Sequence, residues 1–228
     1  MFTSPSTVRR TAFASWVAAW SGVVLAPLHA LARFATVDGA ADLETAITRA
    51  WAVPAADVLA PLLDWASPET VYVTYGKLWF PIMAIAVLAA LVVRAARTPG
   101  RAERWAWRVF LIGLVLGTLG GFGSYYVSLV TPTAVDASAN LLSFPGIVIG
   151  LVGSTWLGIV LLYRRFRPIA TGLLLATWLV SLVVLSTVVA LGAAVLPVVW
   201  AFALATRSLA RQATASSAKL ETAQTAEA

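Results

Sequence analysis

The sequence predicts an all-α fold: a polytopic transmembrane helix bundle of about six spans, with a short amphipathic helical cap on its outer side. The first reason is composition, because the 228 residues are 60% hydrophobic and only 11% charged, with a mean hydropathy of +0.86. Soluble domains carry roughly 25% charged residues. The second reason is that six stretches are apolar enough to cross lipid. The third is that the basic residues are concentrated in every second connection between these stretches, which places nearly all of them on one side of a membrane.

The apolar stretches define the expected elements in chain order. A short cytoplasmic N-terminus at residues 1–10 leads into a single bundle domain at residues 11–212. Its spans are expected at about residues 11–32, 75–93, 106–128, 141–163, 169–188 and 192–206. Residues 213–228 are rich in Ala, Ser and Thr and lack apolar periodicity, so we expect a disordered cytoplasmic tail there.

The first span has two interpretations. Arg9 and Arg10 precede an apolar stretch that ends in the small residues Ala30 and Ala32, which is also typical of a cleaved signal peptide. The apolar core of a signal peptide has roughly 7–15 residues. This stretch has about 22, so its length favours retention as a membrane anchor.

The last two spans come from one uncharged run at residues 169–206, which is 38 residues long. As a single helix it would measure roughly 57 Å, whereas the hydrocarbon core of a bilayer is roughly 30 Å thick. We therefore expect two spans with a turn near residues 189–192, and a single crossing is the alternative. Pro197 is expected to kink the last span.

Charge predicts the orientation. With six spans, all but three of the 16 Lys and Arg residues lie on one side, and Arg33, Arg49 and Lys77 lie on the other. Basic residues collect on the cytoplasmic side, so both termini are expected in the cytoplasm. The abundance of Arg and Ala favours a bacterial source, which makes the bacterial cytoplasmic (cell) membrane the expected location.

The outer segment at residues 34–74 holds six of the ten acidic residues. Asp38 is expected to cap a first short helix, and Pro54 to lie in the first turn of a second, which Pro61 bends or shortens. Both helices have an apolar stripe and are expected to rest on the outer leaflet or to cap the bundle. The acids could instead bind a divalent cation, but their irregular spacing matches no calcium-binding loop.

Small residues recur every four positions in the third and fourth spans. The two series are Gly113, Gly117 and Gly121, followed by Gly146, Gly150, Ser154 and Gly158. Membrane helices associate through close van der Waals packing, which such grooves permit. We expect the two grooves to pack face to face. A seam between copies of the chain and a close approach to a ligand or lipid are the alternatives.

Polar residues near the outer ends of the spans define a candidate outer vestibule. Its members are His29, Lys77, Ser124, Tyr125 and Asn140. His29 is the only histidine and Cys is absent, so no metal site and no cofactor is expected. Ser124 lacks the following glycine of a G-x-S-x-G nucleophile elbow, so no catalytic residue is assigned.

A series of arginines between the second and third spans is expected to contact anionic lipid headgroups. They are Arg94, Arg97, Arg101, Arg104 and Arg108. Because the basic residues flank apolar spans, lipid explains them better than nucleic acid does. No charged residue lies at mid-span, which argues against proton- or sodium-coupled transport.

These observations favour a non-catalytic role. We expect a scaffold or accessory subunit that works through packing, through lipid contact, and through contact with a partner membrane protein or another copy of the chain. A small transporter or permease component that uses the outer vestibule is the alternative, and an intramembrane enzyme is the third candidate.

Overall fold

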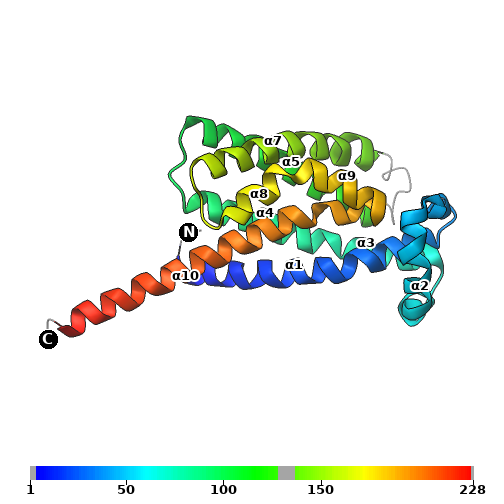
Figure 1. Ribbon diagram of the computed structural model, residues 1–228, viewed down its shortest axis with the longest axis horizontal. Coiled ribbons are helices and arrows are strands. Elements are labelled where there is room, and N and C mark those ends of the chain that lie inside the picture. The colour runs from blue at the N-terminus through cyan, green and yellow to red at the C-terminus, as the bar shows by residue number, and fades with distance from the viewer. Residues whose placement is uncertain (1–3, 128–136, 227–228) are drawn as a thin grey trace.

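The computed structural model describes residues 4–127 and 137–226, with side chains described as far as residue 215. Most of these residues are helical, and none of them lies in a β-strand. The helices, shown in Figure 1, are α1 (Pro5–Phe34), α2 (Ala46–Leu63), α3 (Pro68–Lys77), α4 (Trp79–Ala95), α5 (Arg101–Tyr125), α7 (Phe144–Tyr163), α8 (Ile169–Ala176), α9 (Trp178–Val188) and α10 (Leu196–Ala226). Three short helical segments join them: η1 (Ala40–Glu44), η3 (Ala139–Ser143) and η4 (Leu191–Val195).

Six helical segments within the described residues are long and apolar enough to cross a membrane. They are Pro5–Phe34, Ala46–Leu63, Pro68–Ala95, Arg101–Tyr125, Ala139–Tyr163 and Leu191–Ala215. The fifth expected span, at residues 169–188, instead consists of α8 and α9, which meet at an angle of 64° at Thr177. Helix α10 continues to Ala226, past the expected start of a disordered tail at residue 213.

The segment between the first two expected spans differs from its predicted structure in helix α2. It is one continuous helix that contains both Pro54 and Pro61, so the prediction that Pro54 begins a second helix was wrong. Thr45 caps it, because the hydroxyl of Thr45 accepts a hydrogen bond from the backbone N–H of Thr48 at 3.2 Å. A proline removes one helical hydrogen bond and bends a helix without always ending it.

The long helices form one bundle (Figure 1). Its two ends differ in charge, because most of the basic residues lie at one of them. At the end that we call the arginine end, the start of α1 meets the α4–α5 connection and the middle of α10, and the α7–α8 connection packs against the α4–α5 connection. There the Arg97 guanidinium lies 4.8 Å from the centre of the Phe166 ring, and that of Arg207 lies 4.4 Å from the Trp16 ring. Val8, Arg97 and Leu209 line one small hollow at this end.

At the opposite end, which we call the histidine end, His29 of α1 meets α3, α4 and α5. Helix α2 rests on this end: the Trp51 indole N–H donates to the carbonyl of Val188 at 2.6 Å, and the Thr48 hydroxyl donates to that of Thr187 at 3.1 Å. Both neighbours of α2 in the chain, α1 and α3, reach this same end. Although α2 has the length and hydropathy of a span, it therefore begins and ends at one end of the bundle.

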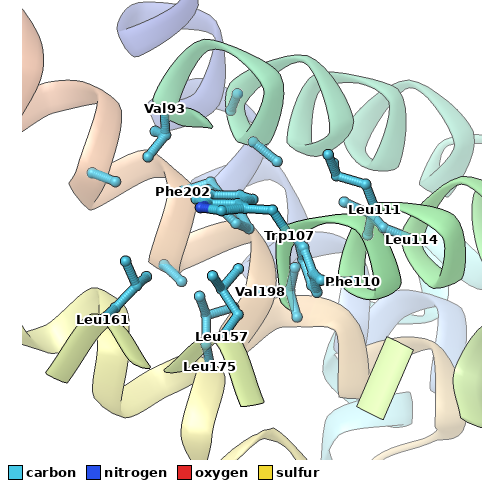
Figure 2. Close-up of a cluster of buried hydrophobic side chains, with 14 of the residues drawn as sticks. Val93, Trp107, Phe110, Leu111, Leu114, Leu157, Leu161, Leu175, Val198 and Phe202 are labelled. Atoms are coloured by element: carbon cyan, nitrogen blue, oxygen red, sulfur yellow. The ribbon is translucent and has the colours of Figure 1, made fainter. Parts of the chain in front are cut away.

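The most extensive cluster of buried hydrophobic side chains lies toward the arginine end, between α4, α5, α7, α8 and α10. Figure 2 shows its largest side chains, with Trp107 and Phe110 of α5 packed against Phe202 of α10. Leu157 and Leu161 of α7 are completely buried in the same cluster. A second cluster lies between α1, α4, η4 and α10, and a third joins the end of α1 to α2 at the histidine end.

Helices α5 and α7 share the most extensive contact in the described chain. A side chain at Gly113 would meet the backbone of Gly150, and one at Gly146 would meet that of Gly117. At Gly153 it would meet the backbone of Phe110. The two backbones thus approach more closely than residues with a Cβ would permit.

Candidate binding cavity

A cavity of about 760 Å³ lies at the histidine end, between α1, α4, α5, α7 and α9. Its mouth includes the exposed residues Ala41, Asp42 and Thr45. Its apolar wall includes Met83 of α4 and Leu114 of α5. Volumes of roughly 300–1,000 Å³ with apolar walls and a few convergent polar groups are typical of small-molecule sites.

His29 forms the centre of the polar part of this cavity and is only 5% exposed. The Trp79 indole N–H donates a hydrogen bond to His29 Nδ1 at 3.1 Å. His29 Nε2 lies 3.3 Å from the hydroxyl of Tyr125, and the imidazole stacks on the ring of Tyr72 with centroids 4.8 Å apart. The imidazole, carried by α1, is therefore held by residues from α3, α4 and α5.

Tyr72 and Tyr125 extend this network into the cavity, which both side chains line. Their hydroxyl oxygens lie 3.2 Å apart. The Tyr125 ring also fills the space in front of Gly76, where a Cβ would overlap it. Gly76 thus allows α3 and α5 to bring the two phenols together.

Arg33 lies one turn after His29 on α1 and lines the same cavity. Its Nε donates to the carboxylate of Asp42 at 2.8 Å. The two side chains are 36% and 46% exposed, so this ion pair faces solvent at the mouth. The guanidinium carbon also lies 5.9 Å from the centre of the Tyr72 ring.

Trp178 closes the deep part of the cavity, just after the bend between α8 and α9. Its indole N–H donates to the carbonyl of Ala194 at 2.6 Å, and a Cβ at Gly150 would lie 3.1 Å from its ring. The indole joins the α9 side of the bundle to η4 and α7. Trp178 is the one buried residue of α9.

The structure brings together two of the five residues expected to form the outer vestibule. His29 and Tyr125 share a hydrogen bond and line the cavity. Lys77, Ser124 and Asn140 do not line it. The backbone carbonyl of Lys77 accepts a hydrogen bond from the Tyr126 hydroxyl at 3.1 Å, and Asn140 is exposed on η3.

Sequence reasoning missed Tyr72, Trp79 and Arg33 as members of this site. From the sequence, Arg33 contributes only to the predicted orientation of the chain. The positions of all three residues gave a usable signal. They lie near the outer ends of the first two expected spans, as His29 does, and a buried polar side chain such as His29 needs hydrogen-bond partners.

The small residues expected to form one interface are divided between several. Gly113 and Gly117 face Gly150 and Gly146, respectively. Gly158 instead packs against the backbone of Ala176 in α8. The other two members differ again: Ser154 donates a hydrogen bond to the carbonyl of Leu175 at 2.7 Å, and a Cβ at Gly121 would meet nothing within 4 Å.

The five arginines expected to contact lipid headgroups lie at the arginine end but do not share one helix face. Arg94 is in the last turn of α4, and Arg97 is in the connection that follows. Exposed positions on α5 hold the other three, which are Arg101, Arg104 and Arg108. The Arg108 guanidinium lies 4.9 Å from the Trp105 ring.

No group of three or more His, Cys, Asp and Glu residues in the described part of the chain could hold a metal ion. Comparison of the chain with protein-family models, with curated proteins and with solved structures gave no significant match.

Proposed function

We propose that this chain is a multi-pass membrane protein that binds an amphipathic small molecule in the cavity at its histidine end, as a small transporter or permease component. The observation that carries this proposal is the cavity itself, which joins a polar mouth at Arg33 and Asp42 to apolar walls at Met83 and Leu114. A bundle that only connects other proteins has no need of such a space.

We also propose a topology of six crossings, formed by α1, α3 with α4, α5, η3 with α7, α8 with α9, and α10. Helix α2 lies on the outer surface, because it begins and ends at the histidine end. The arginine end faces the cytoplasm of a bacterial cell, as the distribution of basic residues favours. The cavity then opens on the outer side, and the basic residues at the other end contact anionic lipid headgroups.

The other two candidate functions rank lower. A scaffold or accessory subunit that contacts a partner membrane protein or a second copy is supported by the lack of catalytic motifs, but it leaves the cavity unused. An intramembrane enzyme is third, because Ser124 does not line the cavity with His29.

The proposal is tested by filling the cavity. Gly121 lines it, and a Cβ there would meet nothing within 4 Å, so Gly121→Phe places a ring in open space without breaking helix contacts. We expect native mass spectrometry of the purified full chain to show bound amphiphiles of cellular origin in the wild type, and to show their loss in Gly121→Phe.

Leu119→Phe is the matched control, since Leu119 is exposed on the same helix and does not line the cavity. This variant should retain the bound species. Equal amounts of bound amphiphile in both variants would contradict the proposal, and so would a wild type that carries none.

A further inference from the structure

We propose that the ligand of this cavity carries an oxyanion headgroup, a carboxylate or a phosphate, bound by Arg33 and by the Tyr72–Tyr125 pair, with an apolar body that extends toward Trp178. This inference rests on the proposed function and names the class of its ligand. The observation behind it is a count of hydrogen-bond donors around His29.

The Trp79 contact defines the protonation of His29. An indole N–H is a donor only, so the Nδ1 atom that it contacts at 3.1 Å has to be the unprotonated acceptor. The imidazole is then neutral, and its one proton is on Nε2. Nε2–H donates to the Tyr125 hydroxyl oxygen 3.3 Å away, which leaves the Tyr125 proton available.

The two tyrosines together hold one proton more than their contacts use. Tyr72 and Tyr125 have two hydroxyl protons, and the single hydrogen bond between them at 3.2 Å uses one, whichever residue donates. His29 cannot accept a hydrogen bond from the second hydroxyl proton, because its Nε2 is itself a donor. Among the described residues, no acceptor contacts the remaining proton, and both phenols line the cavity. This hydroxyl can therefore donate to a ligand.

Arg33 adds more donors at the same place. A guanidinium has five N–H donors and no acceptor. The Nε–H of Arg33 donates to Asp42, which orients the side chain at the mouth, and the guanidinium lies beside the Tyr72 ring. A cluster of donors is best matched by a group that only accepts, and ionised carboxylate and phosphate oxygens do so with charge-assisted bonds.

The rest of the cavity suits an apolar body. Along α5, its wall runs from Gly121 past Gly117 to Gly113, which is roughly 12 Å at 1.5 Å per residue. Met83, Leu114 and Trp178 line the deep part. This length accommodates several methylene groups below a headgroup held at Tyr72.

The test compares the affinities of four probes that share a twelve-carbon chain for the purified full-length protein in a non-ionic detergent. Dodecanoate, dodecyl phosphate, dodecanol and methyl dodecanoate are titrated below their own micelle concentrations, and Kd is measured by calorimetry. We expect one or both of the anionic probes to bind at least about tenfold more tightly than the alcohol and the ester, as expected for hydrogen bonds to a charged group. Preference for phosphate identifies a phospholipid-like source, and preference for carboxylate a fatty acid; either supports the proposal.

Two variants locate the headgroup. The double variant Tyr72→Phe with Tyr125→Phe and the single variant Arg33→Gln should each weaken anionic binding by about tenfold and leave dodecanol unchanged. Tyr75→Phe is the control, because the Tyr75 hydroxyl donates to the carbonyl of Leu62, outside the cavity, at 2.7 Å. Thermal unfolding shows which variants remain folded. If the double variant is unfolded, the result for Arg33→Gln decides.

Two further results distinguish failure of the headgroup assignment from failure of the proposed function. Equal affinity for all four probes, unchanged in folded variants, would overturn the headgroup assignment and leave amphiphile binding intact. Binding of none of the probes, together with no bound species in the native wild type, would overturn both proposals.

Discussion

Glu103 is the most deeply buried acid in the described chain, with an exposed fraction of 1%. Arg97 donates to its two carboxylate oxygens at 2.5 and 3.1 Å, and the Trp107 indole N–H adds a third hydrogen bond at 3.3 Å. These contacts tie the α4–α5 connection to the first turn of α5. The guanidinium of Arg97 is thus occupied by Glu103, although the sequence predicts contact with a lipid headgroup.

Replacing Glu103 tests the importance of this contact. Glu103→Gln leaves the Arg97 charge without its partner, so we expect the free energy of unfolding to fall by roughly 3 kcal/mol. Thermal unfolding in detergent measures the change. Glu69→Gln, at an exposed acid in the first turn of α3, is the control and should unfold with the wild type. Equal midpoints for all three proteins would show that the ion pair contributes no stability.

The sequence could identify His29 because it is unique, but it could not identify the partners of His29. The hydrogen bonds that His29 shares with Trp79 and Tyr125 join it to residues 50 and 96 positions away along the chain. Tyr and Trp also favour membrane interfaces, so their presence near the end of a span does not distinguish an anchor from a site residue. Only the packing of α1 against α3, α4 and α5 makes this distinction.

The α5–α7 contact separates glycines that are needed for packing from glycines that are not. Gly113 lies against the backbone of Gly150, whereas Gly121 faces open space on the same helix. The same change, Gly→Ala, therefore tests both. We expect Gly113→Ala to lower the unfolding midpoint by several degrees, since the added methyl group would overlap backbone atoms.

Gly121→Ala should leave the midpoint unchanged or raise it slightly, because alanine favours the helix by about 1 kcal/mol over glycine. Thermal unfolding of the two variants in one detergent checks both expectations. Equal losses in the two variants, or no loss in Gly113→Ala, would contradict the packing described for α5 and α7.

Helix breaks follow tertiary contacts more than local sequence in this chain. Pro54 and Pro61 lie within the continuous helix α2, whereas α8 and α9 break at Thr177, which is neither Gly nor Pro. The bend places Trp178 where its indole reaches Ala194. Sequence patterns predicted the existence of the apolar elements well, but they could not predict a break that depends on a contact 16 residues away.

The bundle as a whole shows what hydropathy can predict. An all-helical fold with several long apolar helices follows from composition, because lipid requires every backbone polar group to be paired within its own helix. The six candidate spans among the described residues are not the six predicted ones, since they include α2 and omit the bent α8–α9 pair. Hydropathy alone does not show which segments cross. Helix α2 passes the same test of length and apolarity as the bundle helices, yet it returns to the end from which it started.

The proposed function requires the two ends of the bundle to face opposite sides of a membrane. The chain contains no cysteine, so a single added thiol reports its own location. Ala41 is exposed at the cavity mouth, and Ala102 is exposed in the first turn of α5 at the arginine end. In intact cells, a membrane-impermeant maleimide should label Ala41→Cys at once, and should label Ala102→Cys only after the membrane is permeabilised. Labelling of both positions from outside, or of Ala102→Cys alone, would contradict the proposed arrangement.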